Sequence, residues 1–214
     1  VNCGHYDMVQ LAYNVFDIAA AEKDVKSYRD YLGASGLSDL IASAASRDVG
    51  VIAMKVLKIG GRRQDVEKYR TGTTSLYQAM LKWALENRNI SAVVTEILNR
   101  EQMEEDLAVP QSSLQPEERL HLFRYVAQNS RDYCHMCGLC QARCPGKIPT
   151  TEILRCLAYW ENYEKRTRAR EAYAALRPEQ TASHCQNCSS CESVCPYAVR
   201  IRQRIGQAHT LLAA

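Results

Sequence analysis

The sequence has no run of about 18 apolar residues, which excludes a transmembrane helix. It does not begin with a basic stretch followed by an apolar one, so secretion is not indicated and we expect a cytoplasmic protein. The formal net charge is only +3, too small to indicate nucleic acid or an anionic membrane as a partner. No β-hairpin signal appears, which favours parallel strands joined by helices.

Cysteine, in contrast, is abundant. The chain of 214 residues contains 10 cysteines, and 46% of its residues are apolar, enough to bury a core. Eight of the cysteines form two tight clusters after residue 133. Even scatter would indicate buried structural thiols, whereas clustering is typical of metal ligands. Without a secretory signal, a disulfide scaffold is disfavoured.

The two cysteine clusters have the same spacing, C-x2-C-x2-C-x3-C-P, which is that of bacterial ferredoxins with [4Fe–4S] clusters. In such proteins the fourth cysteine, followed by proline, ligates the cluster of the other run. Neither run then completes its own site, which explains why there are two. We expect one cluster on Cys134, Cys137, Cys140 and Cys195, and the other on Cys185, Cys188, Cys191 and Cys144.

Zinc is the main alternative for these thiols. Structural zinc usually takes two CxxC pairs separated by a dozen or more residues, unlike the three closely spaced cysteines found here twice. A zinc-stabilised interaction module without redox activity is therefore an alternative. Cys3 and Cys156 lie outside the repeated pattern, and Cys156 falls in an apolar helical stretch, where a buried packing thiol is expected.

Residues 1–109 alternate between predicted strands and helices, which indicates parallel βα units. We predict strands over 6–14, 51–57 and 90–98. A helix is predicted between the first two, with Ser38 as its N-cap and Gly50 as its end, and another over 73–89.

Residues 110–130 read as a polar connector followed by a helix that begins at Pro116 and turns Leu120, Phe123 and Ala127 inward. Residues 131–214 are predicted to be all-α, with one helical stretch over 150–176 between two cysteine loops and a terminal helix from about Val199. The basic run 164–170 is read either as a solvated helix face or as a docking patch for an acidic redox partner protein.

The stretches "YDMVQLAYN", "GVIAMKVLKIGG" and "ISAVVTEILNREQMEEDLA" resemble the last three strands and following helices of an aldo-keto reductase. The order of these stretches and the two cysteine runs resembles the branch of that family with a C-terminal double [4Fe–4S] ferredoxin-type domain. The resemblance covers essentially the whole chain. It implies the end of a (β/α)8 barrel, about three βα units, followed by a helical two-cluster domain.

The resemblance also implies nicotinamide contacts. Gln10 stands at the position of the family's glutamine that bonds the carboxamide, and Met54 at the position where many members place a stacking tyrosine. The loop containing Lys58, Gly60 and Gly61 would lie beside the pyrophosphate, where glycine permits close approach. NAD(P)H is therefore an expected cofactor.

The last strand departs from the family pattern. Members that bind NADPH have Lys, Ser and Arg where this chain has Glu96, Ile97 and Gln102, and an adenine-contacting Asn where it has Asp106. An acid facing the 2′-phosphate is repulsive. NADH, or no nucleotide, becomes the expectation over NADPH.

A whole barrel takes about 250 residues, and the family's catalytic Asp, Tyr, Lys and His come from its first half. None can be assigned here, and three strands leave inner faces exposed. Because the chain starts at Val1, we expect a portion of a longer oxidoreductase, with the N-terminal barrel half as its missing partner. By itself the chain should not reduce carbonyls. The alternative is a ferredoxin-like electron carrier with a non-catalytic βα docking module.

Overall fold

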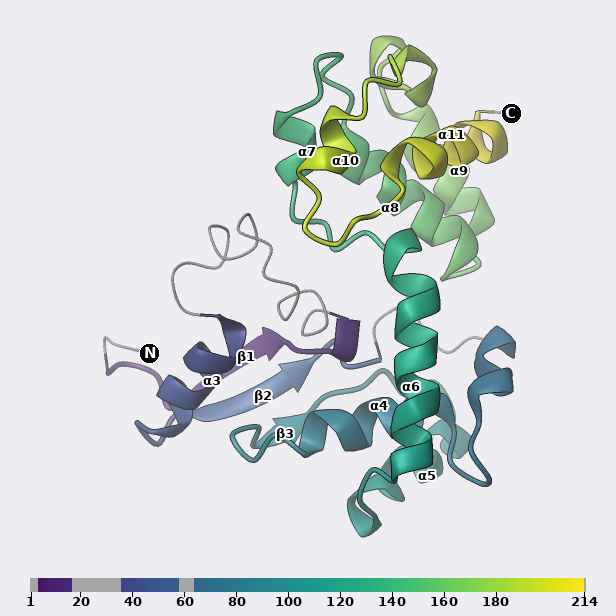
Figure 1. The fold of residues 1–214 in the computed structure, drawn as a ribbon. Coiled ribbons are helices and arrows are strands. Elements are labelled where there is room, and N and C mark those ends of the chain that lie inside the picture. The colour runs from purple at the N-terminus through teal and green to yellow at the C-terminus, as the bar shows by residue number, and fades with distance from the viewer. Residues whose placement is uncertain (1–3, 17–35, 58–63, 214) are drawn as a thin grey trace. The chain divides into compact units, whose positions relative to one another are not determined.

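The computed structural model describes residues 4–16, 36–57 and 64–213, and Figure 1 shows their fold. Packing divides the chain into two compact units, Val1–Ala127 and Gln128–Ala214. The division falls within helix α6 (Pro116–Asn129), inside the segment 110–130 that was predicted to be a connector and helix. Among the described residues, no helix has both the length and the apolar character needed to cross a bilayer.

The first unit is mixed α/β and contains a parallel sheet of three strands, β1 (Met8–Ala12), β2 (Gly50–Met54) and β3 (Ala92–Val93). β2 lies between the other two. β3 is much shorter than the predicted strand over 90–98. Lys55 adopts a left-handed conformation with φ 57°, which ends β2. After Val94 N donates to Ala53 O at 2.8 Å, residues 95–98 have no β2 ladder to join.

Helices α3 (Leu37–Ala45), α4 (Leu76–Leu85) and α5 (Arg100–Leu107) connect or follow these strands. The start of α3 was predicted wrongly, because Gly36 is its N-cap and Ser38 lies in its first turn. Its end was also predicted wrongly, since Ser46 is the C-cap and Gly50 begins β2. Among the described residues, this unit also contains the short 3₁₀ helices η1 (Gln64–Tyr69) and η2 (Val109–Gln111).

The two faces of the sheet differ in exposure. Register partners in a parallel ladder share a face, and successive residues alternate. Val51 and Ala53 are fully buried on one face. On the other, Met8 is 57% exposed, and Val94, which continues β3, is 48% exposed. At β2 one face is therefore buried, and the other, called the open face below, is half-buried to exposed and partly apolar.

The inward face of α6 differs from the prediction. Leu120, Phe123 and Ala127 are exposed, whereas Leu122 and Tyr125 are buried. Tyr125 packs edge-on against the rings of Phe16 and Tyr69. Glu118 is buried on the same stripe, where it pairs with Lys82 of α4. The buried face of α6 therefore includes an acidic residue. A prediction from apolar residues alone puts the buried face on the wrong side of the helix.

The second unit is helical and contains an internal repeat. α7 (Leu139–Ala142) corresponds to α10 (Ser190–Ser193), and α8 (Thr150–Glu161) corresponds to α11 (Ile201–Leu212), with the same difference in residue number throughout. The members of each pair pack on each other. The left-handed backbone positions also repeat, with Met136, Gly138 and Lys147 matched by Asn187, Ser189 and Ala198.

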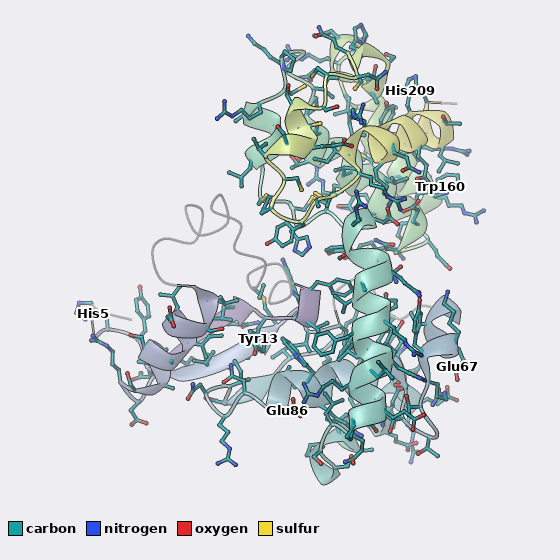
Figure 2. The ribbon with its side chains drawn as sticks, in the orientation of Figure 1. His5, Tyr13, Glu67, Glu86, Trp160 and His209 are labelled. Atoms are coloured by element: carbon teal, nitrogen blue, oxygen red, sulfur yellow. The ribbon has the colours of Figure 1, made fainter. Side chains whose placement is uncertain are left out.

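α8 is separated from α9 (Arg166–Ala174), so the helical stretch predicted over 150–176 contains a break. Glu164, in the left-handed region with φ 53°, lies in this break. Trp160, labelled in Figure 2, carries the guanidinium groups of Arg166 and Arg170 over its ring at 5.3 and 5.0 Å. Part of the basic run therefore folds back onto aromatic rings of α8.

The core of the second unit includes Ile153, Leu154 and Leu157 of α8, together with Cys156, which is 1% exposed. α11 adds Ile201, Ile205 and Leu212. Cys140 and Cys191 belong to the same core. The remaining short elements are the 3₁₀ helices η3 (Ser130–Asp132), η4 (Pro178–Gln180) and η5 (Ala182–His184).

Candidate metal centre

Each cysteine run is a loop closed by a one-turn helix. In the first, Gly138 with φ 80° is the residue before α7, and Cys144 N donates to Gln141 O behind the helix. In the second, Ser189 with φ 64° precedes α10, and Cys195 N donates to Glu192 O. Tight loops of this kind bring thiols three residues apart to one side.

The loops enclose two hollows, and each is lined by four cysteines. The first-run hollow is lined by three thiols of the first run and one of the second, namely Cys134, Cys137, Cys140 and Cys195. The second-run hollow is lined by Cys144, Cys185, Cys188 and Cys191. These are the two sets of four that the crossed pattern in the sequence predicts.

All eight of these cysteines are free thiols. Among the described residues, no group of three or more His, Cys, Asp or Glu side chains is placed to hold a single metal ion. Tetrahedral zinc would need four sulfurs at about 2.3 Å from one point. The four thiols of each set line one hollow.

Burial makes several thiols weaker acids. It raises the pKa of Cys134 to about 12 and that of Cys191 to about 11, with neighbouring cysteines or Glu192 adding to the effect. It also raises the pKa of Cys140 and Cys195. Exposed Cys188 differs, because hydrogen bonds from Ser190 lower its pKa. Because metals bind the thiolate, binding of a metal group by these thiols would release protons.

Polar groups contact some of the sulfurs. Met136 N donates to Cys134 Sγ and Val199 N donates to Cys195 Sγ, both at 3.4 Å. The sulfur of Cys140 lies 3.0 Å from Thr150 Oγ1. Backbone N–H groups aimed at sulfur are the contacts that stabilise the negative charge of a bound iron–sulfur group.

Several further residues of the hollows were not identified from the sequence. His135 and Tyr197 line the first-run hollow, with their rings stacked at 3.3 Å between centroids and 6° between planes. Arg202 lines the second-run hollow. The internal repeat in the sequence could have identified Arg202 as a residue of the site. Arg202 is the counterpart of Thr151, which lines the first-run hollow.

The predicted nicotinamide contacts lie in the first unit. Gln10 is exposed on β1 and Met54 is half-buried at the end of β2. Gln10 pairs with Ile52, which places it and Met54 on the same open face, two positions apart along the strands. Lys58, Gly60 and Gly61 lie outside the described residues.

Polar side chains in and after the segment that follows β3 form local hydrogen bonds. Gln102 Oε1 accepts from Leu98 N at 2.8 Å, and Asp106 Oδ2 accepts from Thr95 Oγ1 at 2.9 Å. Glu96 and Ile97 are exposed. Both side chains that would replace the family's cofactor-binding Arg and Asn therefore have local partners.

Comparison of the chain with protein-family models, curated proteins and solved structures found no match in any of the three.

Proposed function

We propose that this chain binds two [4Fe–4S] clusters and is the C-terminal portion of an iron–sulfur oxidoreductase of aldo-keto reductase type. The observation that carries the proposal is the pair of hollows, each lined by three thiols of one run and the fourth of the other. This interleaving requires two separate ligand sets of soft thiolates, which suit iron–sulfur clusters.

The number and type of side chains around each hollow fit a [4Fe–4S] cluster. Four thiols surround each hollow, and buried apolar side chains such as Ile201 and Ile205 form part of the walls. When bound, each cluster would accept or release one electron. The chain's own contribution is to hold the thiolates, to exclude water with apolar walls and to donate N–H groups to sulfur, as at Cys134 and Cys195.

The reductase part of the proposal rests on the resemblance and on the first unit's parallel strands. The open face that displays Gln10 and Met54 is the one a longer barrel would cover. NAD(P)H-linked reduction is proposed for the intact protein alone, because the family's catalytic Asp, Tyr, Lys and His have no assigned counterparts in this chain.

The test is analysis of iron and acid-labile sulfide in anaerobically purified or reconstituted chain. We expect about eight irons and eight sulfides per chain, with reversible bleaching on reduction, as two [4Fe–4S] clusters require. Zinc without sulfide would overturn the proposal. Binding of NADH or NADPH, followed by fluorescence titration, separates the reductase portion from a ferredoxin-like carrier, which would bind neither. Carbonyl reduction by residues 1–214 alone at enzymatic rates would contradict the assignment as an incomplete catalyst.

A further inference from the structure

The two hollows are equivalent by the internal repeat but differ in chemistry at matching positions. Thr151 of the first-run hollow corresponds to Arg202 of the second-run hollow. Tyr197 of the first-run hollow corresponds to Gly146 of the second. Both the charge and the cover of the two sites are therefore unequal.

Arg202 is fixed in place beside the second cysteine loop. Its Nε donates to Glu192 Oε2 at 3.0 Å, its backbone N donates to Glu192 Oε1 at 3.0 Å, and its Nη1 contacts Asn187 O at 3.4 Å. Glu192 neutralises part of this charge but does not line the hollow, whereas Arg202 does. Arg202 is therefore the charged side chain that lines this hollow, while its ion-pair partner Glu192 acts on the adjacent Cys191.

Aromatic rings cover part of the first-run hollow. The stacked rings of His135 and Tyr197 form part of its wall, and Tyr133 meets His135 edge-on at 5.2 Å. At the position matching Tyr197, Gly146 offers no side chain, and Cys188 is exposed. Solvent therefore reaches one second-run ligand, Cys188, more freely than the other cysteines of either set.

Hydrogen bonds to sulfur do not reverse this difference. The first-run hollow has N–H contacts to Cys134 and Cys195, each 3.4 Å long. In the second-run hollow, Cys188 receives hydrogen bonds from Ser190. Neutral donors thus act at both sites, while the guanidinium acts at one. A full charge outweighs a dipole at similar range, most of all away from bulk water.

We propose that, of the two clusters, the one in the second-run hollow has the higher reduction potential and takes up the first electron because of Arg202. This rests on the proposed function. Reduction adds one electron and one negative charge, supplied in the test by dithionite, and no bond forms or breaks. A nearby cation and exposure to water both stabilise the more negative state. The exposed second-run site is then where electrons pass to or from an external partner.

The experiment is a potentiometric titration of the reconstituted full chain, followed by EPR and visible absorbance. We expect two resolved one-electron steps. Arg202→Thr, which copies the other hollow, should move the higher step to a more negative potential and leave the lower step in place. Thr151→Arg, the reverse exchange, should move the lower step to a more positive potential. Arg202→Lys should retain most of the wild-type separation.

Arg204→Gln is the matched control. It removes the same charge from the same helix, but its guanidinium contacts Glu161 rather than a hollow. It should move neither step. Iron and sulfide are measured in every variant. Absent clusters would overturn the proposed function and this inference together. Two clusters that titrate at one potential, or an unchanged higher step in Arg202→Thr, would overturn this inference alone.

Discussion

Lys82 Nζ donates a hydrogen bond to Glu118 Oε1 at 2.8 Å, and this pair joins α4 to α6 with side chains only 5% and 6% exposed. Glu118 Oε2 also accepts from Gln115 N at 2.9 Å. The carboxylate therefore satisfies a buried ammonium and a backbone donor together.

Replacing Glu118 with Gln should destabilise the first unit, because it leaves the charge of Lys82 buried without a counterion. We expect a loss of about 3 kcal/mol, from removal of one member of a buried pair. Urea denaturation followed by circular dichroism measures it. The control is Glu86→Gln, which breaks the exposed pair with Arg119 between the same helix and the C-cap of α4 and should cost under about 1 kcal/mol. Equal losses in the two variants would contradict the prediction.

The same pair predicts a dependence of stability on pH. Burial alone would raise the pKa of Glu118, but hydrogen bonds from Lys82, Thr74 and Gln115 outweigh it and hold the pKa below its ordinary 4.5. A lowered folded pKa adds stability that is fully present above 4.5 and is lost as pH falls through the folded value. The stability difference between wild type and Glu118→Gln should therefore be constant from pH 7 to 5 and shrink in more acidic solution. A difference that stays constant down to pH 3 would refute this.

Tyr173 links three elements of the second unit. Its Oη accepts from Ala182 N at 3.1 Å and lies 2.8 Å from His209 Nδ1, which Figure 2 labels on α11. Tyr173→Phe leaves the buried N–H of Ala182 without this acceptor, so we expect a loss of about 1–3 kcal/mol in denaturant unfolding. Tyr6→Phe, at a side chain 64% exposed, should stay within about 0.5 kcal/mol of wild type. A neutral Tyr173→Phe would show that another acceptor replaces Oη.

Crossed ligation is tested by pairs of cysteine variants. Cys144→Ser should leave about four irons, and adding Cys188→Ser should remove no more, because both line the second-run hollow. Adding Cys134→Ser to Cys144→Ser should remove both clusters. Cys156→Ala, outside the runs, should keep about eight irons. If Cys144 served its own run, the outcomes of the two double variants would be exchanged.

The parts of the fold and of the candidate site that depend on one kind of residue could be predicted from the sequence. Cysteine spacing is sufficient to name both sets of four thiols that line the hollows. Continuous apolar runs were sufficient to locate β1 and β2. That the thiols bind clusters remains a prediction.

The rest depends on partners distant in sequence. Glu118 faces inward because Lys82 meets it, so an apolar pattern alone pointed to Leu120 and Phe123 instead. β3 ends early because Lys55 turns β2 away, which the local sequence of 90–98 does not encode. Arg202 lines the second-run hollow because the internal repeat gives it the position that Thr151 has in the first-run hollow.

If each set of four thiols binds a cluster as proposed, the crossed arrangement also ties the two loops of the second unit together. A chain cut between α8 and α9 would yield two pieces, each with three thiols for one site and a single thiol for the other. Neither piece could retain a cluster with full ligation unless both stayed associated. Oxidation of one cysteine in either loop would likewise be felt at the hollow of the other loop whenever that cysteine is Cys144 or Cys195. Under the proposed function, loss of one thiol in a loop would therefore affect the cluster held mainly by the other loop.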